Sequence, residues 1–206
     1  MFDVFTFRIC SGLTCPAYGM QVDEKAVRLH RPDLRHVRIV SGTGPGNAPE
    51  DARLRFDRES FSKAAKLASL VLDTPGTTTL TQDCFVGLRT LVKLELKACG
   101  LVSISKALTS LAGCLTKLAL PLNNRLQLAD SDIATLPTLR KLRKLDVRKS
   151  SLKNALTTAD TAAAAAAVTL TYEPPLWSLR SLQHLVSVPN AFLAHHGHAL
   201  SLLVHE

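Results

Sequence analysis

Aromatic residues and long hydrophobic runs are scarce in this sequence. Phe, Tyr and Trp make up 5% of its 206 residues, and residues 86–171 contain none of them. No window holds 18 consecutive apolar residues, so we expect no transmembrane helix. The opening residues, MFDVFTFRICSGL, have no basic segment before an apolar run. We therefore expect no secretory signal, and a mitochondrial presequence stays open.

Cysteine pairs with metal-binding spacing are also missing. The five cysteines include no CxxC pair, because Cys10 and Cys15 are five residues apart and Cys84, Cys99 and Cys114 are scattered. Zinc sites usually draw on such a tight pair, so we expect no metal. An odd number of unpaired cysteines favours a reduced, intracellular protein, either cytoplasmic or nuclear.

The sequence shows no recognisable catalytic signature. It has no Ser-His-Asp, Cys-His or paired-carboxylate pattern with local support. The Gly- and Pro-rich residues 42–53 lack the spacing of a phosphate-binding loop. The histidines of HHGH, residues 195–198, lack a nearby carboxylate or cysteine other than the terminal Glu206 and are interpreted as a surface tail. We expect no enzyme, no cofactor and no small-molecule substrate.

What the sequence does have is a leucine repeat. In LVKLELKACGL, residues 91–101, apolar residues occupy positions one, four, six and eleven, and Cys99 occupies position nine. Similar segments start at residues 67, 91, 115 and 142, at intervals of 24, 24 and 27. The residues that define the repeat are Leu67, Leu70, Leu72, Leu91, Leu94, Leu96, Cys99, Leu101, Leu115, Leu118, Leu120, Asn123, Leu142, Leu145, Val147 and Leu152.

The spacing predicts one short strand in each unit. Positions four and six face inward with the period of two typical of a strand. A polar residue at position nine can satisfy backbone groups where the chain turns. After Leu101, the spacing of Ile104, Leu108 and Leu111 indicates a helix that closes the other side of the unit. Stacked units then share one continuous core.

Weaker copies of the pattern flank the four clear ones. They are Phe2, Phe5, Phe7 and Cys10; Leu34, Val37 and Ile39; and Leu170, Tyr172 and Trp177. We expect a single domain over residues 1–206, with divergent N-terminal repeats or a cap in 1–60 and core repeats in 61–155. Residues 156–206 would form an Ala-rich segment and a divergent C-terminal cap. The alanines of residues 160–168 fit a helix or a spacer, and the apolar spacing of residues 176–186 fits an amphipathic capping element.

The repeat resembles the leucine-rich repeat family, whose signature L-x-x-L-x-L-x-x-N/C-x-L is met most fully at Leu91–Leu101. The resemblance is firm over residues 67–152. It implies an α/β fold, a curved leucine-rich-repeat solenoid of β/α units with a parallel sheet on the concave face, and a role in binding. Pro75 at position nine, Pro121 in the strand and the late Leu126 depart from the signature.

Positive charge is concentrated in one part of the chain. The net charge is +8, and residues 111–155 carry nine basic and three acidic side chains. At position three the repeat aligns His36, Ser69, Lys93, Lys117 and Lys144, so the three lysines form a row of like charge. Glu95 and Asp146, at position five, partly neutralise it. The expected partner-binding residues are Lys93, Lys97, Lys117, Arg140, Lys141, Arg143, Lys144, Arg148 and Lys149.

Three functions fit this pattern. The first is a noncatalytic scaffold in a larger intracellular assembly, binding proteins with an acidic surface through the concave face. The second is an RNA-contacting subunit of a ribonucleoprotein, held by phosphate contacts, although the lack of aromatic residues disfavours base stacking. The third is a substrate adaptor of a ubiquitin ligase, for which no F-box-like segment is found. A solvated face without a partner is an equally simple explanation of the lysines, and the partner's identity stays open.

Overall fold

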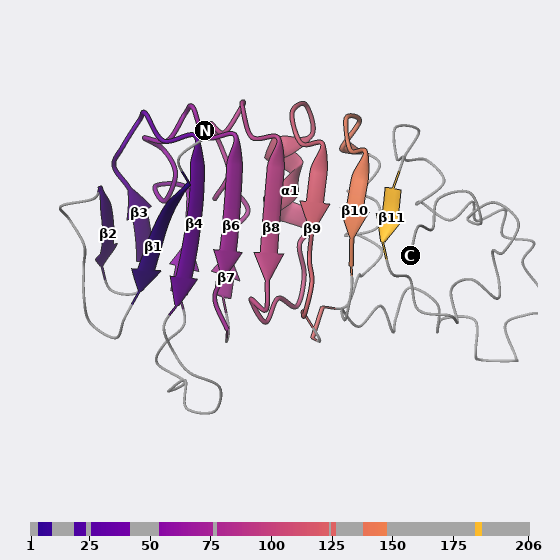
Figure 1. Ribbon diagram of the computed structural model, residues 1–206, viewed down its shortest axis with the longest axis horizontal. Coiled ribbons are helices and arrows are strands. Elements are labelled where there is room, and N and C mark those ends of the chain that lie inside the picture. The colour runs from indigo at the N-terminus through magenta and orange to yellow at the C-terminus, as the bar shows by residue number, and fades with distance from the viewer. Residues whose placement is uncertain are drawn as a thin grey trace, which may run out of the picture.

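The computed structural model describes residues 4–9, 19–23, 26–41, 54–75, 78–123, 125–126, 138–147 and 184–186. A seven-stranded parallel sheet runs along the molecule (Figure 1). Its strands, in spatial order, are β1 (Phe5–Ile9), β4 (His36–Ser41), β6 (Ser69–Asp73), β8 (Lys93–Lys97), β9 (Lys117–Ala119), β10 (Lys144–Asp146) and β11 (His184–Val186). Spatial order therefore follows chain order, as stacked repeats require.

A second layer closes the coils from behind. It begins as a four-stranded sheet of β2 (Met20–Asp23), β3 (Ala26–Leu29), β5 (Leu54–Phe56) and β7 (Thr78–Leu80). It continues as the short helix α1 (Ser105–Leu108) and the 3-10 helix η3 (Thr109–Leu111) behind the strands of the first sheet (Figure 1). Among the described strands of this sheet, β2 and β3 pair antiparallel, whereas β3, β5 and β7 are parallel neighbours.

The parallel register is the one that the repeat predicts. Leu70 pairs with Leu94, Leu94 with Leu118, and Leu118 with Leu145. Strands β6, β8, β9 and β10 each start with the same contact to the preceding strand of the sheet. For example, the Val92 carbonyl accepts the N–H groups of Thr116 and Lys117 at 2.9 and 3.0 Å, and the Thr116 carbonyl accepts those of Arg143 and Lys144 at 2.8 and 3.1 Å. The coils are therefore joined in one common register.

The core lies between the two layers. Every described leucine of the repeat is buried, and Phe56, Phe61 and Phe85 stack beside them with ring centroids 5.7 and 5.9 Å apart. Fully burying one such side chain contributes roughly 1.5–3 kcal/mol before conformational entropy is counted. Since a single coil cannot cover its own leucines, this gain depends on the neighbouring coils.

The expectation of β/α units holds for one described coil and is wrong for those before it. Ile104, Leu108 and Leu111 are buried on α1 and η3, as their spacing predicts. The earlier coils return through strands β5 and β7 instead of helices. Their three-residue segments, LRF and TTL, start with a buried side chain followed by an exposed one. Such short segments pair with the strand of the adjacent coil more readily than they can form a helix.

The weak N-terminal copies are genuine repeats. Phe5 pairs with Val37 and Phe7 with Ile39 in the large sheet. At the other end the prediction needs correction, because the strand that pairs with β10 is His184–Val186, not the segment around Leu170 and Tyr172. Residues 184–186 of the expected C-terminal cap form this strand, which lies at the edge of the large sheet.

Several predicted features lie outside the described residues. They are Cys10, Cys15, residues 42–53, Arg148, Lys149, Leu152, the alanines of 160–168, and HHGH. Among the helices that are described, none is long and apolar enough to cross a membrane.

Candidate partner-binding face

Three rows of side chains cross the outer face of the large sheet. Position three contributes His36, Ser69, Lys93, Lys117 and Lys144, in the predicted order, and His184 of β11 extends the register. Position five contributes Thr6, Arg38, Val71, Glu95 and Ala119, and position seven contributes Arg8, Val40, Asp73 and Lys97. We call this surface the outer face.

The middle of the outer face is electrostatically neutralised. The Lys93 ammonium lies 3.1 Å from Glu95 on the same strand. One Asp73 carboxylate oxygen accepts from both Arg38, at 2.8 Å, and Lys97, at 3.0 Å. Lys93 and Lys97 were both predicted to meet a partner, and the structure places each of them in an ion pair. Their charge is therefore less available than the repeat pattern alone indicates.

The β9 and β10 end of the outer face is strongly basic. Lys117 and Lys144 are exposed, pair in register, and make no ion pair among the described residues. Arg140, Lys141 and Arg143 are exposed in the residues that lead into β10. We call Lys117, Arg140, Lys141, Arg143 and Lys144 the basic patch. Adjacent strands lie about 4.8 Å apart, so the charges of Lys117 and Lys144, which pair in register, repel each other.

Asp146 occupies position five of β10, in register with Ala119 of β9 and Glu95 of β8. Asp146 is buried, whereas Glu95 is half-buried. The Asp146 carboxylate is therefore less accessible to a partner at the surface than that of Glu95.

A ladder of polar side chains inside the turns supports the face. The Asn123 amide nitrogen donates to the Leu96 carbonyl at 2.7 Å and to that of Leu120 at 3.0 Å, while its oxygen accepts the Leu101 N–H at 3.4 Å. One coil earlier the Cys99 thiol reaches the Leu72 and Lys97 carbonyls at 3.5 and 3.3 Å. Position nine thus performs the predicted role in both coils.

The departure at Pro75 is compensated next to it. The Thr74 hydroxyl lies 2.8 Å from that of Thr78 and donates to the Cys99 sulfur at 3.3 Å. Both threonines are buried. Desolvation raises the pKa of Cys99 to about 11 and that of Cys84 to about 12, so both thiols stay protonated. These groups stabilise the turn and offer no reactive thiolate.

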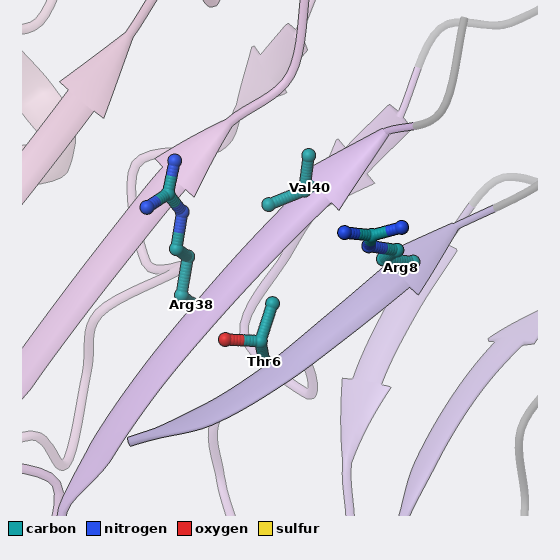
Figure 2. A pocket seen from close by; sticks show the side chains of 4 residues that line it. All are labelled: Thr6, Arg8, Arg38 and Val40. Atoms are coloured by element: carbon teal, nitrogen blue, oxygen red, sulfur yellow. The ribbon is translucent and has the colours of Figure 1, made fainter.

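A hollow that the repeat pattern did not reveal opens at the other end of the outer face. It has a volume of about 450 Å³ and is lined by Thr6, Arg8, Arg38 and Val40 of β1 and β4 (Figure 2). Applying positions five and seven to FDVFTFRIC would have pointed to Thr6 and Arg8. The described part of the chain contains no group of three or more His, Cys, Asp and Glu residues that could hold a metal ion.

Comparison with known proteins gives little further information. No protein-family model matches the chain, and no curated protein matches it. Among solved structures, it is similar to the crystal structure of an internalin from Listeria monocytogenes, with 17% identity and a TM-score of 0.44. The match covers 79% of this chain and 40% of the internalin chain. The description of the fold therefore depends on the chain's own strand order and register.

Proposed function

We propose that the chain is a noncatalytic repeat scaffold that binds a protein partner through the outer face, as a subunit of a larger assembly. The observation that carries this proposal is the register of the large sheet, which aligns outward side chains from successive coils in continuous rows. A binding surface assembled from rigid strands is already organised before the partner arrives. Less ordering entropy is then lost on binding.

The partner that best fits the basic patch is an acidic protein segment. Five exposed basic side chains lie there, those of Lys117, Arg140, Lys141, Arg143 and Lys144. Such a surface attracts an acidic segment from a distance and raises its association rate. The attraction should weaken as salt is added, because the Debye length is about 8 Å at physiological ionic strength.

RNA is the second candidate, and the same basic patch is the observation that favours it. Phosphates could contact lysine and arginine without any reading of sequence. The patch, however, lies in the part of the chain that has no aromatic residue, residues 86–171. Binding of single strands usually gains about 1–3 kcal/mol per stacked base from aromatic side chains. This contribution is missing here, so the protein partner is favoured.

The test compares two double variants in a quantitative pull-down from native lysate, with and without ribonuclease. Lys117→Glu/Lys144→Glu reverses charge on the outer face. Lys63→Glu/Lys66→Glu makes the same change at exposed lysines between β5 and β6 and serves as the control. Circular dichroism first checks that both variants keep the wild-type fold.

The expected result is a set of proteins that survives ribonuclease, is retained by the control and is lost by Lys117→Glu/Lys144→Glu. Equal retention by both variants would show that the outer face is not the binding surface. Loss of all partners on ribonuclease treatment would replace the protein partner with RNA.

A further inference from the structure

The hollow between β1 and β4 has the composition of an anion site. Figure 2 shows Arg8 and Arg38 on either side of Thr6 and Val40, with all four side chains on the same face of the two strands. A guanidinium group offers a planar set of donors that matches a carboxylate, and a threonine hydroxyl can donate as well. The described residues of the lining include no acidic one.

The charges around the hollow leave an excess of cations. Arg38 and Lys97 share the single carboxylate of Asp73, at 2.8 and 3.0 Å. Arg8 is exposed and makes no ion pair with any described residue. Among the described residues, Arg8, Arg38 and Lys97 thus outnumber the one carboxylate of Asp73. The ion pair with Asp73 offsets part of the Arg38 charge, as it does for Lys97, but it also holds the Arg38 side chain in place, so less conformational entropy is lost when a ligand binds there.

We propose that this hollow binds a carboxylate side chain of an acidic partner segment and forms a second anchor on the outer face. This inference rests on the proposed function, because it assumes that the partner is an acidic protein. It adds that the partner carries two separated acidic groups, one for the hollow and one for the basic patch. Between the two anchors, Asp73 and Glu95 neutralise the surface and favour an uncharged stretch of the partner.

The strand order sets the distance between the anchors. Five strand intervals separate β1 from β10, which corresponds to about 24 Å at about 4.8 Å each. An extended peptide advances about 3.3 Å per residue, so about seven residues bridge that distance. The expected partner segment is therefore acidic at both ends, neutral in the middle, and laid across the strands.

Fluorescence anisotropy with synthetic peptides tests this geometry on the full chain. The first probe has three glutamates at each end and about seven Gly and Ser residues between them, the length given by the strand spacing. The second has the same composition with all six glutamates at one end. The third has glutamine in place of every glutamate, and a single-stranded RNA oligonucleotide of the same charge is the fourth.

Arg8→Ala should weaken binding of the first peptide about three- to tenfold, the range for one partly exposed charge-assisted contact. It should leave the second peptide within about twofold of wild type, because that peptide engages the basic patch alone. Arg55→Ala, at an exposed arginine on the four-stranded sheet, is the matched control and should change neither. Arg8 makes no described ion pair, so its removal should not affect folding.

The outcomes separate the two proposals. If Lys144→Ala weakens the first peptide and Arg8→Ala does not, the anchor in the hollow is refuted and the scaffold proposal stands. If neither variant weakens binding of the first peptide, or if the glutamine peptide binds as tightly as the first peptide, the acidic-partner proposal fails too. If the RNA oligonucleotide binds more tightly than the first peptide and shows the same dependence on Arg8, the hollow is a general polyanion site and the carboxylate assignment is wrong.

Discussion

Replacing Asn123 by alanine should destabilise the fold by about 3 kcal/mol. The side chain is fully buried and bonds the carbonyls of Leu96 and Leu120 at 2.7 and 3.0 Å and the N–H of Leu101 at 3.4 Å. Each typical hydrogen bond contributes roughly 0.5–1.5 kcal/mol, and a buried group left without a partner costs about 1–3 kcal/mol. Because the 3.4 Å contact to Leu101 is weak, the carbonyls of Leu96 and Leu120 account for most of the loss in stability. Water that enters the vacated space offsets part of this loss.

Urea unfolding followed by circular dichroism measures this loss as a change in the free energy of unfolding. At this chain length about 3 kcal/mol corresponds to a fall in melting temperature of about 6–12 °C. Arg125→Ala, at an exposed residue of the same turn, is the control and should change stability by less than about 0.5 kcal/mol. A loss below about 1 kcal/mol for Asn123→Ala would refute the reasoning, because it would mean that the backbone groups find other partners.

Three further predictions use other parts of the chain. Leu94→Ala should cost about 2–5 kcal/mol in urea unfolding because Leu94 is fully buried, whereas Val92→Ala, at a side chain 43% exposed, should cost well under half of that. The pKa of Cys99 is raised to about 11 from an ordinary value of 9.0, so above pH 9 the unfolded thiol ionises while the folded one does not. Stability should then fall between about pH 9 and pH 11, and pH-dependent melting should show a shallower fall for Cys99→Ala; an identical slope would contradict the assignment. If RNA binds the basic end of the outer face, anisotropy at several salt concentrations should show weaker binding and a flatter salt dependence after substitution to Ser at Lys93, Lys117, Lys144 and Arg148.

The large sheet was predictable because its signal is redundant. Leu70, Leu94, Leu118 and Leu145 recur at the same position of successive units, and a shift by one residue would turn each of them toward solvent. Each coil therefore adds the burial of its own leucine in favour of the same register. The row of Lys93, Lys117 and Lys144 follows from the same register.

The return layer could not be predicted in the same way. Its strands β5 and β7 are three residues long, too short to show a period. They form because β5 pairs with β3 and β7 pairs with β5, across neighbouring coils, which is a tertiary effect. The spacing of Ile104, Leu108 and Leu111 extends over more residues, and there the predicted helical conformation is found.

Charge neutralisation on the outer face also depended on details that spacing does not contain. The repeat places Lys97 and Asp73 in neighbouring strands, but the Arg38 contact to the same carboxylate depends on rotamers. The neighbour of β10 on its other side is β11, whose first residue lies 40 positions after the first residue of β10. That interval breaks the 24-residue period and hides the strand from a search for repeats.

The contacts that join successive coils have a consequence for how such a chain can change length. Thr116 bonds the Val92 carbonyl, Thr90 the Leu67 carbonyl, and Asn123 the Leu96 carbonyl, across 24, 23 and 27 residues. Each of these bonds reaches the adjacent coil and no farther. Duplication or deletion of one whole coil would therefore recreate the same contacts at a single new junction. Each added coil would widen the outer face by one strand, about 4.8 Å. The distance between the hollow and the basic patch could therefore change while the residues of both stay the same.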